Sequence, residues 1–343
     1  MSSAEKRDGG RPGAIARGAK ERRPYERRPD ERRPDEQRPE ARYPIRLVVL
    51  DLDGTLIGED RPIGPRTRAA IARALAAGVH VAIATGRMPT SAAVYAIELG
   101  LTLPVLAYQG ALVRNMPEPG RRLGRIVSHR PIPAAVAREV VEWTRARGLD
   151  PHLNHLERFI IRADDPQAAD YSRFLGSRAE LVPDLMAAIV HPVTKVLAVG
   201  EPALVEKLLA EARIAFDGRA AATISHPRFL EFIASGVSKG RAVRWLARRL
   251  GVPLEQTMAI GDQHNDLEMI GAVGHGVAMP TAPAEVLAVA RHVAPPLEDE
   301  GAAQMVERLV LSGREGTTRG AGKRGDGGRT AEPHDDEDTA GAA

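Results

Sequence analysis

Residues 45–56 read IRLVVLDLDGTL, a mostly apolar run followed at once by two aspartates, Asp51 and Asp53. An apolar run of this length, closed by an Asp-Gly pair, predicts a buried strand that ends in a turn. A second apolar run, 257–260, is followed in the same way by Gly261 and Asp262. If the two strand ends meet, the two acidic segments form a site for a metal ion and a phosphate group.

The sequence around these two runs alternates between short β-branched runs and segments of helical spacing. This alternation is typical of βαβ units and a mostly parallel sheet, so the predicted fold class is α/β. The expected strands are 45–50, 79–84, 105–107, 257–260 and a late strand at 289–293. The expected helices are 65–77, 89–99, 239–250 and one that starts near Asn265.

The middle of the chain, residues 128–234, has its own succession of helical and strand segments and could bury a core of its own. Its expected helices are 133–147, 166–175 and 203–212, and its expected strands are 158–162, 194–199 and 229–233. The candidate site segments lie on both sides of this region. The simplest arrangement is one catalytic sheet, built from 45–127 and 235–312, interrupted by an inserted α+β domain that covers the site as a cap.

Both ends of the chain are expected to be disordered tails, 1–44 and 313–343. Residues 1–44 hold 13 Lys and Arg against 9 Asp and Glu, and repeat the pentapeptide ERRPD. Such a segment has almost nothing apolar to bury. It could serve as a weak arm for nucleic acid, but the interleaved acids neutralise the field such an arm needs. The alternative of a nucleic-acid or scaffold binder with a vestigial core rests on this tail alone.

Composition excludes several classes of site. The 343 residues include no cysteine, so a disulfide framework, a thiolate metal site and a cysteine nucleophile are all excluded. The N-terminus lacks the apolar region of a signal peptide, and every apolar run is shorter than a membrane span. We therefore expect a soluble, cytoplasmic protein with no membrane partner. The sequence does not indicate an oligomeric state.

Four polar residues lie at predicted strand ends or helix starts, namely Asp51, Thr85, Lys239 and Asp262. In an open α/β sheet, the crevice at the carboxyl ends of the strands is where ligands bind. The Asp51 carboxylate can attack phosphorus and form an aspartyl-phosphate that water later hydrolyses. Asp53 can protonate the leaving oxygen and then activate water, or present its backbone carbonyl to a metal.

Carboxylates that face a phosphate group require a hard divalent cation held by oxygen ligands, and Mg²⁺ is the natural choice. Asp51 and Asp262 would supply the side-chain ligands. The Thr85 hydroxyl can hold phosphoryl oxygens, and the Lys239 ammonium can offset negative charge in the transition state. Asp266 would orient Lys239 or the hydrated metal.

Each of these residues also has a purely structural explanation. An Asp-Gly pair is a common turn, and Thr85, Ser238 and Asp262 could be helix N-caps. A calcium-binding EF-hand is excluded by spacing, because DLDGT lacks a third acid before its glycine. A phospho-acceptor regulatory domain shares the Asp, Thr and Lys inventory, but it needs neither the late Asp pair nor the large insert.

Taken in order, five segments resemble the haloacid dehalogenase superfamily, most closely its Cof-type (IIB) phosphatases, whose C2-type cap is inserted between the second and third motifs. The segments are DLDGTL at 51–56, ATGR at 84–87, GVSKG at 236–240, GDQHNDLEM at 261–269 and EDEGA at 298–302. The resemblance implies a Rossmann-like core with a parallel sheet, Mg²⁺, and hydrolysis of small phosphate monoesters such as sugar or cofactor phosphates. Phosphomutases and other phosphoryl transferases of the same superfamily share the core and remain an alternative.

The resemblance also implies a role for each residue of these segments. It gives Asp51 as nucleophile and Asp53 as acid and base. The implied metal ligands are Asp51, Asp262 and the backbone carbonyl of Asp53. Asp266 is implied to support these ligands or to bind the metal through a water molecule. The implied contacts to substrate or phosphate are Thr85, Gly86, Lys239 and Asn265.

Two segments depart from the family pattern. Gln109-Gly110-Ala111 stands where the family usually has Asn-Gly-Ala, and Met279-Pro280-Thr281 replaces the commoner Met-Gly-Asn. Both are expected near the substrate entrance, with Gln109 a candidate substrate contact, so the identity of the substrate does not carry over. Arg87 is a second candidate contact, or else an exposed arginine in a first helical turn. His264 has no partner visible in the sequence and is interpreted as a surface residue.

Overall fold

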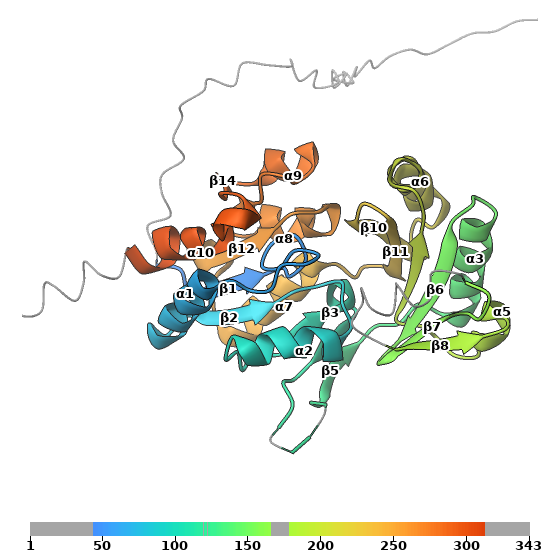
Figure 1. The fold of residues 1–343 in the computed structure, drawn as a ribbon, viewed down its shortest axis with the longest axis horizontal. Helices are drawn as coiled ribbons and strands as arrows, with labels where there is room; N and C mark the ends of the chain where they lie inside the picture. The colour runs from blue at the N-terminus through green and yellow to red at the C-terminus, as the bar shows by residue number, and fades with distance from the viewer. Residues whose placement is uncertain (1–43, 119, 122, 166–177, 313–343) are drawn as a thin grey trace, which may run out of the picture. The chain divides into compact units, whose positions relative to one another are not determined.

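The central feature of the fold is a parallel sheet with strand order β14-β13-β12-β1-β2 (Figure 1). The computed structural model describes residues 44–118, 120–121, 123–165 and 178–312. The sheet strands are β1 Leu47–Leu50, β2 His80–Ile83, β12 Thr257–Gly261, β13 His275–Ala278 and β14 His292–Val293. All four pairings are parallel, which confirms the predicted α/β class with its parallel sheet.

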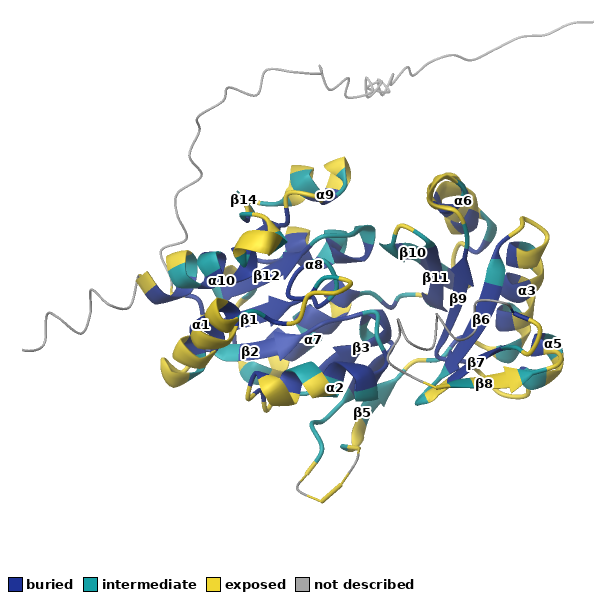
Figure 2. Ribbon diagram, in the orientation of Figure 1, coloured by how far each residue is buried: buried dark blue, intermediate teal, exposed yellow. Residues whose placement is uncertain are grey.

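Strand β1 is buried on both faces because its alternate side chains enter two different hydrophobic clusters. Val48 and Leu50 pack in the cluster of helices α1, α2 and α10, whereas Leu47 and Val49 pack in the cluster of α7, α8 and α9. These helices are α1 Pro65–Ala76, α2 Pro89–Glu98, α7 Lys239–Leu250, α8 Leu267–Ala272, α9 Ala284–Val289 and α10 Gly301–Val306. Figure 2 shows β1 and β12 as buried and the outer faces of α1 and α9 as exposed.

The register of the sheet brings the predicted site segments together. Leu50, the last residue of β1, pairs with Ile83 of β2 on one side and with Ile260 of β12 on the other. Because parallel strands end at the same edge, the residues after all three strands emerge side by side. The Asp51 backbone N–H donates to the Ile260 carbonyl at 3.0 Å and continues the pairing into the acidic segment.

A short antiparallel sheet, β3-β4-β5, leads from the parallel sheet toward the inserted region. Its strands are β3 Val105–Ala107, β4 Leu112–Arg114 and β5 Ile126–His129, and a bridge between Ala84 and Leu106 joins it to the end of β2. The turn after β3 holds Tyr108 and Gln109 at φ angles of 49° and 59°. This region is uncommon for residues other than glycine, so the surrounding contacts must fix the turn.

The inserted region forms a second sheet of order β10-β11-β9-β6-β7-β8, in which the β7–β8 pair is parallel and the other pairs are antiparallel. Helices α3 Ala134–Arg145, α5 Leu185–Ala188 and α6 Pro202–Ala215 pack with it around a separate core. The strands are β6 Asp150–His155, β7 Arg158–Arg162, β8 Ala179–Val182, β9 Lys195–Val199, β10 Ala220–His226 and β11 Phe229–Ala234. This is the predicted α+β insert, called the cap below.

Some predicted elements differ from the structure. The late strand predicted at 289–293 is wrong in its first part, because helix α9 continues through Val289 and only His292–Val293 forms a strand. Strands β4, β5, β6, β8, β10 and β13 were not predicted. The helix expected at 166–175 lies outside the described residues, as do the predicted tails apart from Pro44. Within the described ranges, no helix has the length and apolar character needed to cross a bilayer.

Candidate active site

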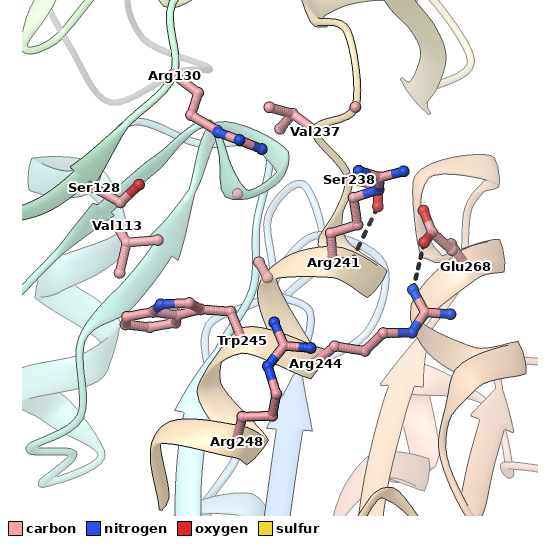
Figure 3. Close-up of a pocket in the computed structure, with 13 residues that line it drawn as sticks. Val113, Ser128, Arg130, Val237, Ser238, Arg241, Arg244, Trp245, Arg248 and Glu268 are labelled. Carbon is pink, nitrogen blue, oxygen red and sulfur yellow. Dashed lines mark hydrogen bonds and ion pairs between the residues drawn. The ribbon is translucent and has the colours of Figure 1, made fainter.

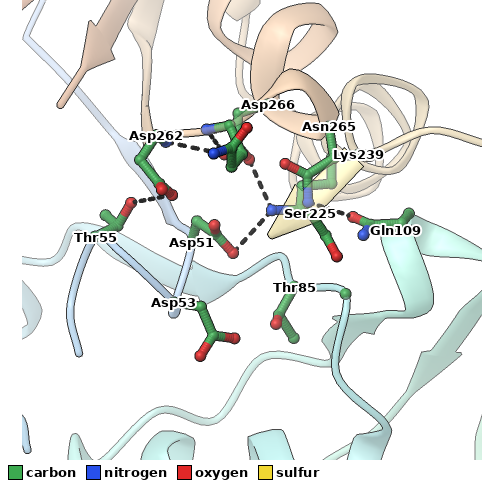
Figure 4. Close-up of polar contacts among 12 residues, drawn as sticks. Asp51, Asp53, Thr55, Thr85, Gln109, Ser225, Lys239, Asp262, Asn265 and Asp266 are labelled. Carbon is green, nitrogen blue, oxygen red and sulfur yellow. Dashed lines mark hydrogen bonds and ion pairs between the residues drawn. The ribbon is translucent and has the colours of Figure 1, made fainter. Parts of the chain in front are cut away.

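The candidate nucleophile, Asp51, is the first residue after β1, and its exposed fraction is only 4%. One of its carboxylate oxygens, Oδ1, lies 2.8 Å from Nζ of Lys239 (Figure 4). Lys239 is the first residue of α7 and is fully buried. The first turn of that helix is fixed by Ser238, whose hydroxyl accepts the Arg241 backbone N–H. The result is a buried ion pair at the carboxyl edge of the sheet.

Asp266 holds Lys239 from the other side. Its Oδ1 accepts from Lys239 Nζ at 2.7 Å, and its Oδ2 accepts the backbone N–H groups of Asp262 and Gln263 at 3.0 and 3.1 Å. Both carboxylate oxygens are therefore used within the protein. Asp266 therefore lies where it can orient Lys239.

Asp262 completes the acidic cluster. A carboxylate oxygen from each of Asp51, Asp262 and Asp266 lies within 4.8 Å of the other two. The Thr55 hydroxyl donates to Asp262 Oδ1 at 3.3 Å and joins the loop after β1 to the loop after β12. A Cβ on Gly54 would lie 2.2 Å from Asp262 Oδ2, and Gly54 has a φ of +75°. The glycine of DLDGT is thus required for the close approach of the two loops.

The electrostatics of the cluster follow from burial. Burial raises the pKa of Asp51 to about 7, the charge of Asp266 adds to this rise, and Lys239 opposes it. Burial and the charge of Asp51 likewise raise the pKa of Asp262 well above its usual value. Burial acts to lower the pKa of Lys239, but the carboxylates of Asp266 and Asp51 outweigh it and raise that pKa. The ammonium is therefore stable, while the clustered carboxylates repel one another.

These residues fit a hard divalent cation. Two buried carboxylates, Asp51 and Asp266, and the half-buried carboxylate of Asp262 face a single ammonium, so the cluster has an excess of negative charge when all three are ionised. Every candidate ligand is oxygen, which suits Mg²⁺. Because Asp266 is already engaged by Lys239 and by two amides, Asp51 and Asp262 are the carboxylates left to hold an ion. The buried Oδ1 of Asn265 also has no hydrogen-bond partner among the described residues.

Arg87 is part of this site. Its guanidinium donates to both carboxylate oxygens of Asp53, with Nε to Oδ2 at 2.8 Å and a terminal nitrogen to Oδ1 at 2.6 Å. The exposed fraction of the Arg87 side chain is 14%, so its interpretation as an exposed arginine is wrong. The Arg87 backbone N–H donates to the hydroxyl of Thr85, which is fully buried. Asp53 and Thr85 are thereby held on neighbouring loops.

The side chains of Gln109 and Asn265 are hydrogen-bonded to each other and do not point into an open substrate site. The Gln109 side chain donates to Glu231 Oε2 at 2.7 Å and accepts from Asn265 Nδ2 at 3.0 Å. A Cβ on Gly86 would lie 2.5 Å from Gln109 Nε2, so Gly86 makes room for this amide. Both polar atoms of Gln109 are taken by protein groups. A direct contact between Gln109 and a substrate would have to replace one of these bonds.

Sequence reasoning missed two cap residues that reach the site, Lys195 on β9 and Glu231 on β11. Lys195 Nζ donates to Glu231 Oε1 at 2.7 Å and to the Gly86 carbonyl at 2.9 Å. The Ser225 hydroxyl donates to the same Glu231 oxygen at 2.7 Å. Both charged side chains are buried. The available signal was a charged residue inside each of the apolar runs KVLAV and FLEFIA.

His264 is not the surface residue that the sequence suggested. The exposed fraction of its side chain is 8%. Its Nδ1 lies 2.6 Å from a carboxylate oxygen of Glu285 on α9, and its Nε2 lies 3.4 Å from Glu206 on cap helix α6. The prediction failed because both partners come from distant parts of the chain.

The alternative in which site residues act only as helix caps is confirmed for one residue and wrong for two. Ser238 is the N-cap of α7. The N-cap of α2 is Met88 rather than Thr85, and the N-cap of the short turn 264–266 is Gln263 rather than Asp262. Capping therefore does not explain the hydroxyl of Thr85 or the carboxylate of Asp262.

Comparison with known proteins agrees with this geometry. A family model described as haloacid dehalogenase-like hydrolase matches residues 48–306. The chain is 28% identical over 271 residues to the 5-amino-6-(5-phospho-D-ribitylamino)uracil phosphatase YitU of Bacillus subtilis. This alignment covers 76% of this chain and 96% of that protein. It is 29% identical over 254 residues to an HMP-PP phosphatase of Cronobacter sakazakii, which covers 72% of this chain and 89% of that protein.

Among solved structures, a haloacid dehalogenase-like hydrolase from Bacteroides thetaiotaomicron superposes with a TM-score of 0.65 at 27% identity, covering 77% of this chain and 99% of that one. The family match spans the parallel sheet and the whole cap, including the insertion of the cap between the loops that carry Thr85 and Lys239. The resemblance drawn from the five sequence segments is confirmed. This chain belongs to the haloacid dehalogenase-like hydrolases.

Proposed function

We propose that this protein is a Mg²⁺-dependent phosphatase that hydrolyses small phosphate monoesters, either sugar phosphates or phosphorylated cofactors, through an aspartyl-phosphate on Asp51. The observation that carries the proposal is the placement of the Asp51 carboxylate. It is buried at the end of the central strand, 2.8 Å from Lys239 and beside the carboxylate of Asp262. Membership of a hydrolase family and the phosphatase names of two relatives support hydrolysis.

In the first step, a carboxylate oxygen of Asp51 forms a bond to phosphorus as the bond to the leaving oxygen breaks. Asp53 donates a proton to that leaving oxygen. For this, the Asp53 carboxyl group must give up its ion pair with Arg87 and contact the substrate instead. The Thr85 hydroxyl and the Lys239 ammonium bind the phosphoryl oxygens. Mg²⁺, held by Asp51, Asp262 and the Asp53 carbonyl, would supply positive charge against the phosphate.

In the second step, Asp53 is a carboxylate and takes a proton from water. The water oxygen bonds to phosphorus, and the bond between phosphorus and the Asp51 oxygen breaks, which releases phosphate and restores the Asp51 carboxylate. Lys239 lies 2.8 Å from Asp51, and Asp266 holds the same ammonium from the other side at 2.7 Å. The lysine therefore stabilises negative charge at the same place in both steps.

The test is phosphate release from p-nitrophenyl phosphate with Mg²⁺ and with EDTA. We expect EDTA to abolish release and Asp51→Asn to reduce it more than about 1000-fold. Asp60→Asn is the matched control, because Asp60 is exposed and lies on the same loop outside the acidic cluster. Activity that persists in Asp51→Asn would contradict its assignment as the nucleophile.

Hydrolysis and phosphoryl transfer differ in where the phosphate group goes. A hydrolase releases inorganic phosphate from a bisphosphorylated sugar, whereas a mutase leaves the sugar phosphorylated and moves the group to another position. We expect free phosphate to account for the substrate consumed. A screen of phosphate release over phosphorylated metabolites would then identify the substrate.

A further inference from the structure

A second candidate binding site lies where the chain passes between the parallel sheet and the cap. It is a pocket of about 640 Å³ lined from both connections, by Ser128 and Arg130 before the cap and by residues 236–238 after it (Figure 3). Helix α7 forms its floor with Arg241, Arg244, Trp245 and Arg248. The lining includes none of the residues assigned above to phosphate chemistry.

The pocket is strongly basic. It is lined by four arginines, Arg130, Arg241, Arg244 and Arg248, and by a single carboxylate, Glu268. Glu268 is already bonded to Arg244. The other three arginines are exposed to solvent, and within the described residues their guanidinium groups form no ion pair. The pocket thus holds an excess of positive charge.

These arginines repel one another weakly, because Arg130, Arg241 and Arg248 are exposed to solvent, and a bound anion would relieve that repulsion. Arg241, Arg244 and Arg248 lie at helical spacing on one face of α7, where like charges destabilise the helix. Arg130 adds a fourth guanidinium from the opposite wall, and its side chain extends toward α7 (Figure 3). Guanidinium groups bind phosphate oxygens in a paired geometry, so opposed arginines suit a ligand with several phosphate groups.

One wall of the pocket also carries an aromatic ring. Trp245 is half-buried and lines the pocket with Val113, and the guanidinium carbon of Arg249 lies 5.8 Å from its ring centroid. A planar ring could stack on the face away from Arg249. Ser128 and Ser238 also line the pocket, and the Ser238 hydroxyl accepts the Arg241 backbone N–H. A volume of about 640 Å³ falls in the range of small-molecule sites and suits a ligand of nucleotide size.

We propose that this pocket binds a nucleoside di- or triphosphate, with its phosphate groups on Arg130, Arg241 and Arg248 and its base stacked on Trp245. This site is separate from the active site and does not depend on the proposed phosphatase activity. Its ligand would touch both connections to the cap and the helix that begins with Lys239. The bound anion would offset the repulsion among the arginines.

The experiment is calorimetric titration of the full chain carrying Asp51→Asn, to prevent turnover, with ATP and with inorganic tripolyphosphate. We expect both probes to bind. Combined Arg130→Gln and Arg248→Gln should weaken both by about tenfold or more, as expected for lost charged hydrogen bonds. Trp245→Leu should weaken ATP and leave tripolyphosphate unchanged. Arg145→Gln removes the same charge from an exposed site on cap helix α3 and should change neither.

Three results would overturn the proposal. The first is no heat of binding with either probe at millimolar concentration. The second is undiminished binding in the double arginine variant, which would place the probes elsewhere on the chain. The third is binding of a single-stranded RNA without binding of ATP, which would make the pocket part of a nucleic-acid surface. Unfolding midpoints of all variants establish that lost binding is not lost folding.

Discussion

At the scale of single residues, Asp51 is subject to opposing demands. As the proposed nucleophile it must be ionised, yet burial and the charge of Asp266 favour its protonated form. Lys239 partly offsets this by placing an ammonium at 2.8 Å. The remaining cost depends on pH and on cations, and can therefore be measured.

The stability of the cation-free protein should fall as the pH rises from about 4 to about 7. The pKa of Asp51 is about 7 in the folded chain against a usual value of 3.8, so the folded state holds the extra proton in this window. The free energy of unfolding decreases with pH wherever the folded state binds more protons. In EDTA, Asp51→Asn should therefore gain thermal stability relative to wild type across this window. A difference between the two proteins that is constant with pH would contradict the prediction.

Asp266→Asn should damage both stability and catalysis. The variant leaves Lys239 buried with one carboxylate in place of two, and such a loss typically costs about 3 kcal/mol. We expect a lower kcat with little change in KM, because Asp266 positions Lys239 from behind. Glu268→Gln is the matched control, since its bond to Arg244 is near the surface and is worth less than about 1 kcal/mol. Urea unfolding and steady-state kinetics measure the two effects. Equal losses of stability and kcat in Asp266→Asn and Glu268→Gln would contradict this prediction.

The positions of Asp51, Thr85 and Asp262 could be predicted from the sequence, because each follows a predicted strand and parallel strands end at one edge. Lys195 and Glu231 could not be predicted. Their pairing depends on the register of β9 against β11, which a single sequence does not specify. The same limit applies to His264, whose two partners lie on α9 and α6.

At the scale of elements, the cap reaches the catalytic sheet through a buried charge pair. Lys195 on β9 and Glu231 on β11 lie side by side, and they bond to the Gly86 carbonyl and to Gln109 in the loops that carry the site. Removing one partner of such a buried pair is strongly destabilising, whereas replacing both partners with apolar residues often changes the stability little. We therefore infer that the pair serves mainly to position the cap against the loops of the site.

Glu231→Gln alone should destabilise the protein by about 3–5 kcal/mol, because Lys195 is then buried without a carboxylate. Adding Lys195→Met should recover part of that loss. Glu180→Gln, which removes the exposed Arg158 pair on neighbouring cap strands, should cost less than about 1 kcal/mol. Urea unfolding of the three variants measures these differences. A double variant less stable than Glu231→Gln would show that the two residues act independently.

Helices and strands with strong patterns were predictable, and two of the strands that were missed, β6 and β10, have weak patterns. Strand β10 reads AAATISH and β6 reads DPHLNH, with small or polar residues in place of a β-branched run. Strand β6 forms because β7 and β9 supply hydrogen bonds on its two sides. Strand β10 forms at the edge of the cap sheet, where β11 supplies the hydrogen bonds. Tertiary pairing, rather than local preference, forms them.

At the scale of the whole molecule, the parallel sheet is assembled from two separated stretches of chain. β1 and β2 precede the cap, whereas β12, β13 and β14 follow it, so the pairing of β1 with β12 closes the acidic cluster. An ion shared by Asp51 and Asp262 would therefore link the two halves of the sheet. Binding energy at that point should appear as resistance of the whole protein to unfolding.

Mg²⁺ should raise the unfolding midpoint of the full chain. A ligand at about 100 times its dissociation constant adds about 2.7 kcal/mol to the free energy of unfolding, a shift of about 5 °C for a protein of this size. Asp262→Asn should lose most of the shift, because it removes one of the two carboxylates available to the ion. Asp217→Asn, at an exposed position beyond the end of α6, should keep it. An equal shift in Asp262→Asn would mean that the ion binds elsewhere, and that the two halves of the sheet are joined without it.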